Sequence, residues 1–190
     1  TRIVVSTWLA IGAVLIGPVA GSGQVPNPPE EAALAVPPEM PYLPGVLGPY
    51  RRPITTSSPW AQAYFDQGLQ LLYAFSKPAA ASSFREARRQ DPSCAMCYWG
   101  EALALGPFLN GRMSAPNAGP AYEAAMEALR LAEAQSLPAV ERAMIEAMSV
   151  RYSEVHDPAT RAQLDSTYSS VTAEVYRAFP NDLDVATVYA

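Results

Sequence analysis

The chain has 190 residues, which is enough for one domain of ordinary size and an additional tail or anchor. Its 13 Lys and Arg residues are outnumbered by 18 Asp and Glu residues, so the formal net charge is −5. This balance argues against a broad nucleic-acid-binding surface, which needs a basic face to release counterions. With only two cysteines, the chain is also not a scaffold held together by a disulfide framework.

The first segment, residues 1–23, predicts contact with a membrane. An uncharged, apolar run at residues 3–20 follows Arg2, and as a helix it would be about 27 Å long, close to the thickness of a bilayer core. A cleaved signal peptide and a retained anchor both fit this pattern. We favour the anchor because of this length, and expect residues 3–20 to cross the lipid bilayer. Arg2 would stay in the cytoplasm, which places a single-pass protein in the inner membrane with its bulk in the periplasm.

Residues 24–57 form a proline-rich segment, here called the strap. Proline removes backbone donors and fixes φ, so we expect an extended chain with neither a helix nor a central strand. Two interpretations stay open: a spacer between membrane and domain, or a segment that lies on a partner protein. The strap carries more apolar side chains than a spacer needs, and these are the candidate partner contacts: Met40, Tyr42, Leu43, Val46, Leu47 and Tyr50.

The third segment, residues 58–190, is predicted to be all-α, because apolar residues recur at helical spacing and no strand-like alternation occurs. Ser58 followed by Pro59 is typical of a helix start. The expected helices lie near residues 58–75, 78–90, 94–105, 120–135, 138–152 and 158–178, with a short last helix from residue 183.

A spacing of 34 residues relates these helices to one another. Small residues at fixed positions would let two helices approach closely, aromatic residues would fill the space between them, and a proline would end the second helix. The residues at these positions are Tyr64, Gly68, Leu71, Ala80, Phe84, Ala87 and Pro92. A second unit begins at Ala95, with small residues later at Ala121, Ala125 and Ala128.

This pattern resembles the tetratricopeptide repeat (TPR), and residues 53–190 resemble a family of exported bacterial TPR proteins. The resemblance implies a solenoid of helical hairpins that binds partners by shape. The strap rather than a capping helix precedes the first repeat, and the last segment, residues 183–190, carries no helix stop signal. We therefore expect both ends of the solenoid to expose apolar surface in the free protein.

The stretch "DPSCAMCYWGEA", residues 91–102, contains the C-x-x-C pair Cys94 and Cys97. No His follows Cys97, which excludes covalent haem attachment, and no second pair completes a zinc site. Three roles stay open. Packing at the turn into a helix is favoured over thiol redox chemistry and over a structural disulfide.

Other candidate chemistry is sparse. Arg85, Arg88 and Arg89 form a basic cluster that is either a solvated helix face or a contact for an acidic partner. His156, the only histidine, is expected to be a loop residue. No catalytic, cofactor-binding or metal-binding residues are expected.

These features predict a non-enzymatic, membrane-anchored scaffold that binds and stabilises subunits of a bacterial membrane protein complex. A photosynthetic reaction-centre and light-harvesting complex is one such setting. The alternatives are a periplasmic thiol oxidoreductase that uses Cys94 and Cys97, and a soluble exported peptide-binding TPR module.

Overall fold

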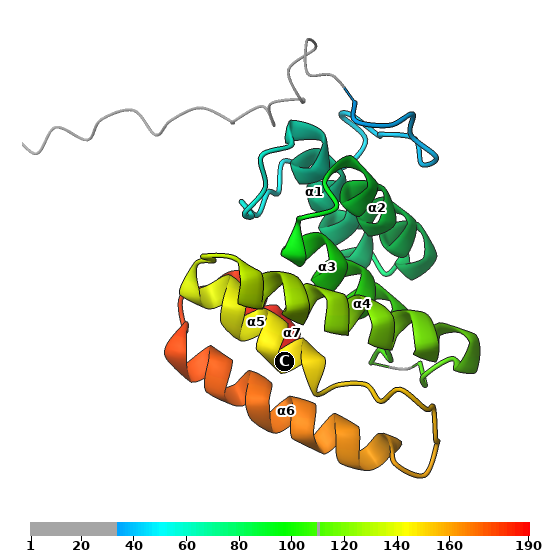
Figure 1. Ribbon diagram of the computed structural model, residues 1–190, viewed down its shortest axis with the longest axis vertical. Coiled ribbons are helices and arrows are strands. Elements are labelled where there is room, and N and C mark those ends of the chain that lie inside the picture. The colour runs from blue at the N-terminus through cyan, green and yellow to red at the C-terminus, as the bar shows by residue number, and fades with distance from the viewer. Residues whose placement is uncertain (1–33, 110) are drawn as a thin grey trace, which may run out of the picture.

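The computed structural model describes residues 34–109 and 111–190, and its regular structure is entirely helical within those ranges (Figure 1). The expected all-α class is therefore confirmed for this part of the chain. The helices are α1 (Pro59–Tyr73), α2 (Lys77–Gln90), α3 (Ala95–Leu105), α4 (Ala115–Ala134), α5 (Ala139–Ser149), α6 (Arg161–Ala178) and α7 (Leu183–Tyr189).

Local capping signals explain where some of these helices begin. The Ser58 hydroxyl accepts a hydrogen bond from the Ala61 amide at 3.2 Å, and Pro59 occupies the first turn of α1. The Asp182 carboxylate caps α7 by accepting from the amides of Asp184 and Val185. α1, α2 and α3 each begin within one residue of the expected position.

The largest difference from the expected boundaries is at α4, which begins at Ala115 instead of residue 120. Pro116 lies in its first turn and Pro120 lies inside the helix. A proline in the first turn costs little because the amide it lacks would have no helical partner there. α6 begins three residues later than expected, since the Asp157 carboxylate accepts from the Ala159 amide in the turn before the helix.

The helices form a stack of consecutive pairs. Each helix packs against the next one in the chain, and α1 also contacts α3 while α3 contacts α5. Figure 1 shows α1 and α2 at one end of the long axis, with α5 and α6 at the other. α1, α3 and α5 therefore lie next to one another along one side of the stack.

Close approach of three helices occurs around the ring of Phe84, which is fully buried. A Cβ atom added to Gly68 of α1 would lie 2.7 Å from this ring, and one added to Gly100 of α3 would lie 2.4 Å from it. Of the residues selected by the repeat spacing, Pro92 is exposed in the turn after α2. The others are buried in the helices: Tyr64, Gly68, Leu71, Ala80, Phe84 and Ala87.

None of the helices in the described ranges has the length and apolar character needed to cross a membrane. The expected anchor, residues 1–23, lies outside the described residues.

Candidate functional site

The described part of the strap, residues 34–57, contains no helix and folds back over the helical stack (Figure 1). Side chains of α1, α2 and α5 form hydrogen bonds with its main chain from Ala35 to Thr55. The strap thus occupies a surface made by several helices, in the way that an extended peptide would occupy a binding groove.

Three glutamines each bind the strap main chain with both ends of the carboxamide. Gln90 accepts from the Ala35 amide (2.8 Å) and donates to the Val36 carbonyl (2.9 Å). Gln67 accepts from the Leu43 amide (2.8 Å) and donates to the Pro41 carbonyl (3.1 Å).

Gln62, in the first turns of α1, completes this set. It accepts from the Ile54 amide at 3.0 Å and donates to the Arg52 carbonyl at 2.8 Å. A carboxamide provides both a donor and an acceptor, so each glutamine satisfies one N–H and one C=O of an extended chain. The three glutamines bind main-chain groups only, so these hydrogen bonds do not depend on which side chains the strap carries.

Carboxylates and a hydroxyl hold further main-chain groups of the strap. Glu86 accepts from the Glu39 amide at 3.0 Å, and Glu141 accepts from the Thr55 amide at 3.0 Å. The Tyr64 hydroxyl donates to the Met40 carbonyl at 2.9 Å. Glu86 is 1% exposed and Glu141 is 4% exposed, so these carboxylates are buried where the strap covers them.

The candidate partner residues of the strap mostly face this protein's own helices. Met40, Tyr42, Leu47 and Tyr50 are half-buried against the core, and the Tyr42 ring packs edge-on against Trp60 and Tyr64. Leu43 is half-buried, and Val46 is 73% exposed. The end of the stack at α1 and α2 is therefore covered by the strap, contrary to the expectation that it exposes apolar surface.

Arg52 joins the strap to the far end of the chain. Its side chain is 8% exposed, and Nη1 lies 2.8 Å from Asp182 and 2.7 Å from Asp184 at the start of α7. Asp184 also accepts hydrogen bonds from the hydroxyls of Tyr50 (2.5 Å) and Tyr73 (2.6 Å). This buried ion-pair cluster closes the strap against α1 and α7 together.

Asp66 of α1 accepts from the Arg52 amide at 3.0 Å and from Gln62 Nε2 at 3.0 Å, and its side chain is 7% exposed. Burial raises the pKa of Asp66 to about 6, despite these hydrogen bonds and the nearby charge of Arg51. The folded state therefore binds a proton more tightly at Asp66 than the unfolded chain does.

We expect Asp66 to lower the free energy of unfolding as pH rises from about 4 to about 6, by roughly 2–3 kcal/mol. Below this window the carboxyl is protonated in both states, so it contributes no penalty. Urea unfolding of the wild type and of Asp66→Asn at a series of pH values tests this. Their difference in stability should change across the window; a constant difference would show that Asp66 titrates normally.

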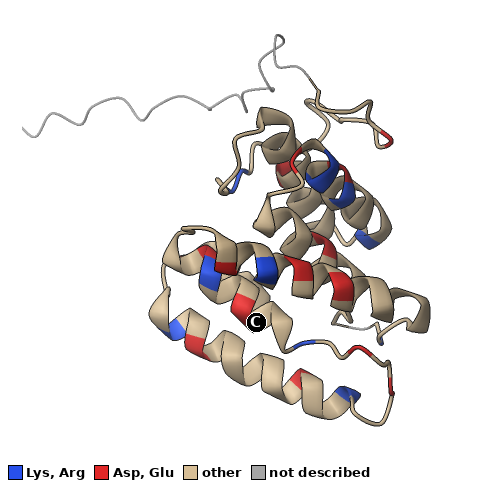
Figure 2. Ribbon diagram, viewed as in Figure 1, with Lys and Arg blue, Asp and Glu red and all other residues tan. Residues whose placement is uncertain are grey.

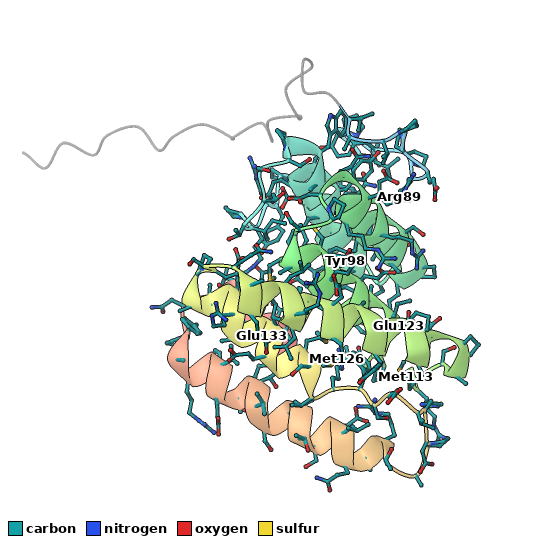
Figure 3. All side chains as sticks on the ribbon, in the orientation of Figure 1. Arg89, Tyr98, Met113, Glu123, Met126 and Glu133 are labelled. Atoms are coloured by element: carbon teal, nitrogen blue, oxygen red, sulfur yellow. A yellow bond between two sulfur atoms is a disulfide. The ribbon has the colours of Figure 1, made fainter. Side chains whose placement is uncertain are left out.

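The basic residues of α2, drawn as blue segments of that helix in Figure 2, are paired within the chain. Arg85 and Arg88 both form ion pairs with Glu101 of α3, at 3.0 and 3.1 Å. Arg89, labelled in Figure 3, pairs with Glu86 at 2.7 Å and with Glu39 of the strap at 3.2 Å. These arginines link α2 to α3 and to the strap, which gives them a role within the fold.

Cys94 and Cys97 are joined by a disulfide bond, and both are fully buried. The sequence favoured packing at the turn and ranked a structural disulfide lower. The structure has both, because the two cysteines are packed in the turn and are also bonded to each other. Cys94 Sγ also accepts from the Cys97 amide at 3.2 Å and so caps α3. Because neither sulfur is exposed in this state, an exchange partner has no access to the bond.

The residues that hold the strap were missed at the sequence level, although a pattern marks them. Gln62, Asp66 and Gln70 recur every four residues on α1, and Glu86 and Gln90 do the same on α2. Polar side chains at this spacing share one helix face. Such a face is ordinarily assigned to solvent, but here Gln62, Asp66, Glu86 and Gln90 are buried.

No group of three or more His, Cys, Asp or Glu residues in the described ranges has a metal-binding arrangement. His156 lies in the loop before α6, as expected. Comparisons with protein-family models, with curated proteins and with solved structures gave no match.

Proposed function

We propose that this protein is a scaffold of TPR-like helical hairpins that stabilises subunits of a bacterial membrane protein complex from the periplasmic side. Consecutive helix pairs, with Phe84 against Gly68 and Gly100, support the TPR-like part of this proposal. The buried disulfide supports an exported location, because disulfides persist in oxidising compartments.

The observation that carries the proposal is the binding of the strap main chain by three glutamines. A proline-rich spacer that touched nothing would be semi-rigid along its length, but it would leave the helical stack free to rotate about its point of attachment. A strap held at residues 35–55 acts instead as a rigid arm. It moves the attachment point of the helical stack back to residue 35, nearer in sequence to residues 1–23, for which we propose a membrane anchor.

The same contacts favour a second function, a peptide-binding module. Because the glutamines read only backbone groups, an extended segment of another protein satisfies them equally well. In this case the strap is a competitor that a partner segment displaces. The two functions differ in how firmly the strap is held.

Hydrogen–deuterium exchange of the full chain tests both proposals. We expect the amides of Ala35, Leu43 and Ile54, which donate to the three glutamines, to exchange at least about tenfold more slowly than in an unstructured peptide. Gln62→Ala combined with Gln67→Ala and Gln90→Ala should remove this protection. Gln163→Ala, at an exposed position of α6, is the matched control.

Protection that survives the triple substitution would contradict the glutamine-held arm. Protection close to that of an unstructured peptide in the wild type would instead favour a displaceable strap, and with it the peptide-binding module.

A further inference from the structure

The strap is held in two halves of unequal strength. Its first half, residues 34–43, lies against α1 and α2, whereas its second half, residues 47–57, also reaches α5 and α7. The second half contains the buried side chain of Arg52, which is paired with two aspartates. In the first half Glu39 pairs with Arg89, but the Glu39 side chain is 74% exposed, so this pair is worth no more than about 1 kcal/mol. The first half is therefore the part that separates more readily from the helices.

A turn at residues 44–46 joins the two halves. Gly45 has φ of +70°, a left-handed conformation that glycine adopts without steric cost, and no described atom lies within 4 Å of a Cβ added there. Val46 is 73% exposed, and its amide donates to the Leu43 carbonyl over a long 3.5 Å. The shape of this turn thus depends on the backbone freedom of one glycine, which makes the turn a hinge between the halves.

The first half presents its main chain to α1 and α2 in a regular pattern. The amides of Ala35, Glu39 and Leu43, which are four residues apart, donate to side chains of these two helices. Three prolines lie between them and have no amide that would need a partner. The Tyr42 ring adds a side-chain contact, edge-on against Trp60. A segment that replaces the first half must offer the same amides and the same ring, and the first half of another copy of this chain offers both by identity.

We propose that two copies of this chain exchange the first halves of their straps, so that residues 34–43 of each copy lie on α1 and α2 of the other. Residues 47–57 stay on their own helices. The side chains that bind the first half are buried beneath it, and the exchange uncovers and covers them again with the same sequence. Because the contacts between copies equal those within one copy, the two states differ chiefly in the conformation of the turn and in the entropy of association.

The length of the turn sets the concentration at which the exchange occurs. A short connection holds the first half near its own helices at an effective concentration on the order of millimolar. We therefore expect closed monomers at micromolar concentration and exchanged dimers as the concentration of the chain approaches millimolar. The strap amides are paired in both states, so the exchange does not rest on either function proposed above.

Cross-linking between two differently substituted full chains tests the exchange. One chain carries Glu39→Cys and the other carries Arg89→Cys, because these side chains approach to 3.2 Å in the folded strap. Cys94 and Cys97 are bonded to each other, so only the introduced thiols react with a short bismaleimide. The chains are mixed at about 1 mM before the reagent is added, in the range where exchange competes with the closed form. A product that joins the two different chains, identified by its mass, then reports the strap of one copy on α2 of the other.

Two substitutions of Gly45, each made in both chains, separate exchange from chance contact. A β-branched residue is strongly disfavoured at positive φ, so Gly45→Val should open the turn and raise the yield of the mixed product at least about fivefold. Asparagine tolerates this conformation, so Gly45→Asn should give nearly the wild-type yield. Gln67→Ala with Gln90→Ala in the Gly45→Val chains should abolish the gain, since these glutamines hold the exchanged half.

Three outcomes would overturn the exchange. Equal yields from Gly45→Val and Gly45→Asn would show that the turn does not control the association. Gly45→Val chains whose Leu43 amide loses its protection from hydrogen exchange, yet which give no mixed product, would show that an open strap recruits no second copy. A yield that survives the two glutamine substitutions would place the contact between copies elsewhere in the chain.

Discussion

Replacement of Arg52 by methionine is expected to lower the free energy of unfolding by about 3–5 kcal/mol, a large part of the stability of an ordinary domain. Methionine keeps much of the apolar stem but removes the charge. Asp182 and Asp184 then remain close together without their cation, and Asp184 is only 4% exposed. The tyrosine hydroxyls that bond Asp184 cannot replace a full positive charge. Urea unfolding at neutral pH measures the loss.

Arg51→Met is the matched control, since Arg51 is the neighbouring residue but its side chain is 42% exposed. Its ion pair with Asp66 at 3.3 Å is worth no more than about 1 kcal/mol at such exposure. A loss at Arg52 that is as small as the loss at Arg51 would mean that the buried cluster does not hold the strap.

The same two proteins also allow a second measurement, the pH dependence of the difference in free energy of unfolding between wild type and Arg52→Met. Burial raises the pKa of Asp182, but hydrogen bonds from Arg52 and from two amides of α7 outweigh burial, so the net pKa is lowered. A lowered folded-state pKa contributes stability above the unfolded pKa that is lost on acidification. The stability difference between wild type and Arg52→Met should therefore shrink as pH falls below about 4.

The helices were predictable because their signals are local. Ser58 and Pro59 start α1, and the DPS sequence after Gln90 ends α2. Each signal acts within one turn of helix, so it can be read without knowing the fold. The start of α4 was predicted five residues late because Pro116 and Pro120 were taken as loop residues. Pro116 lies in the first turn, where it interrupts no helical hydrogen bond, so it does not mark a loop. Pro120 lies inside the helix and removes one such bond, which is why its position suggested a helix boundary.

The site could not be predicted to the same degree, because its contacts join distant parts of the chain. Proline content predicts an extended strap, but it does not say which surface the strap covers. Arg52 meets its partners across 130 residues or more, and its own neighbours in sequence give no sign of this. The spacing of polar residues on α1 and α2 can be recognised in the sequence. Only the folded structure shows that the strap covers these polar faces.

The second large expected effect concerns the Phe84 ring: replacing both Gly68 and Gly100 by alanine should lower the free energy of unfolding by about 2–4 kcal/mol. Each new Cβ would lie under 3 Å from this ring. The ring has no space to move into, because it is fully buried and packs edge-on against Phe65 at 5.4 Å. Overpacking of this kind costs about 1–3 kcal/mol per site. It exceeds the gain of up to about 1 kcal/mol that alanine brings to a helix.

Gly119→Ala is the control, since Gly119 also lies in a helix, α4, but no atom lies within 4 Å of an added Cβ. This variant should be more stable than wild type by about 0.5–1 kcal/mol, because only the helix propensity changes. Phe84→Leu provides the matching rescue. In the double-alanine background it should cost less than it does alone, because leucine relieves the clash; strictly additive losses would place the clash elsewhere. That coupling, measured by urea unfolding, decides whether Phe84 sets the distance between α1, α2 and α3.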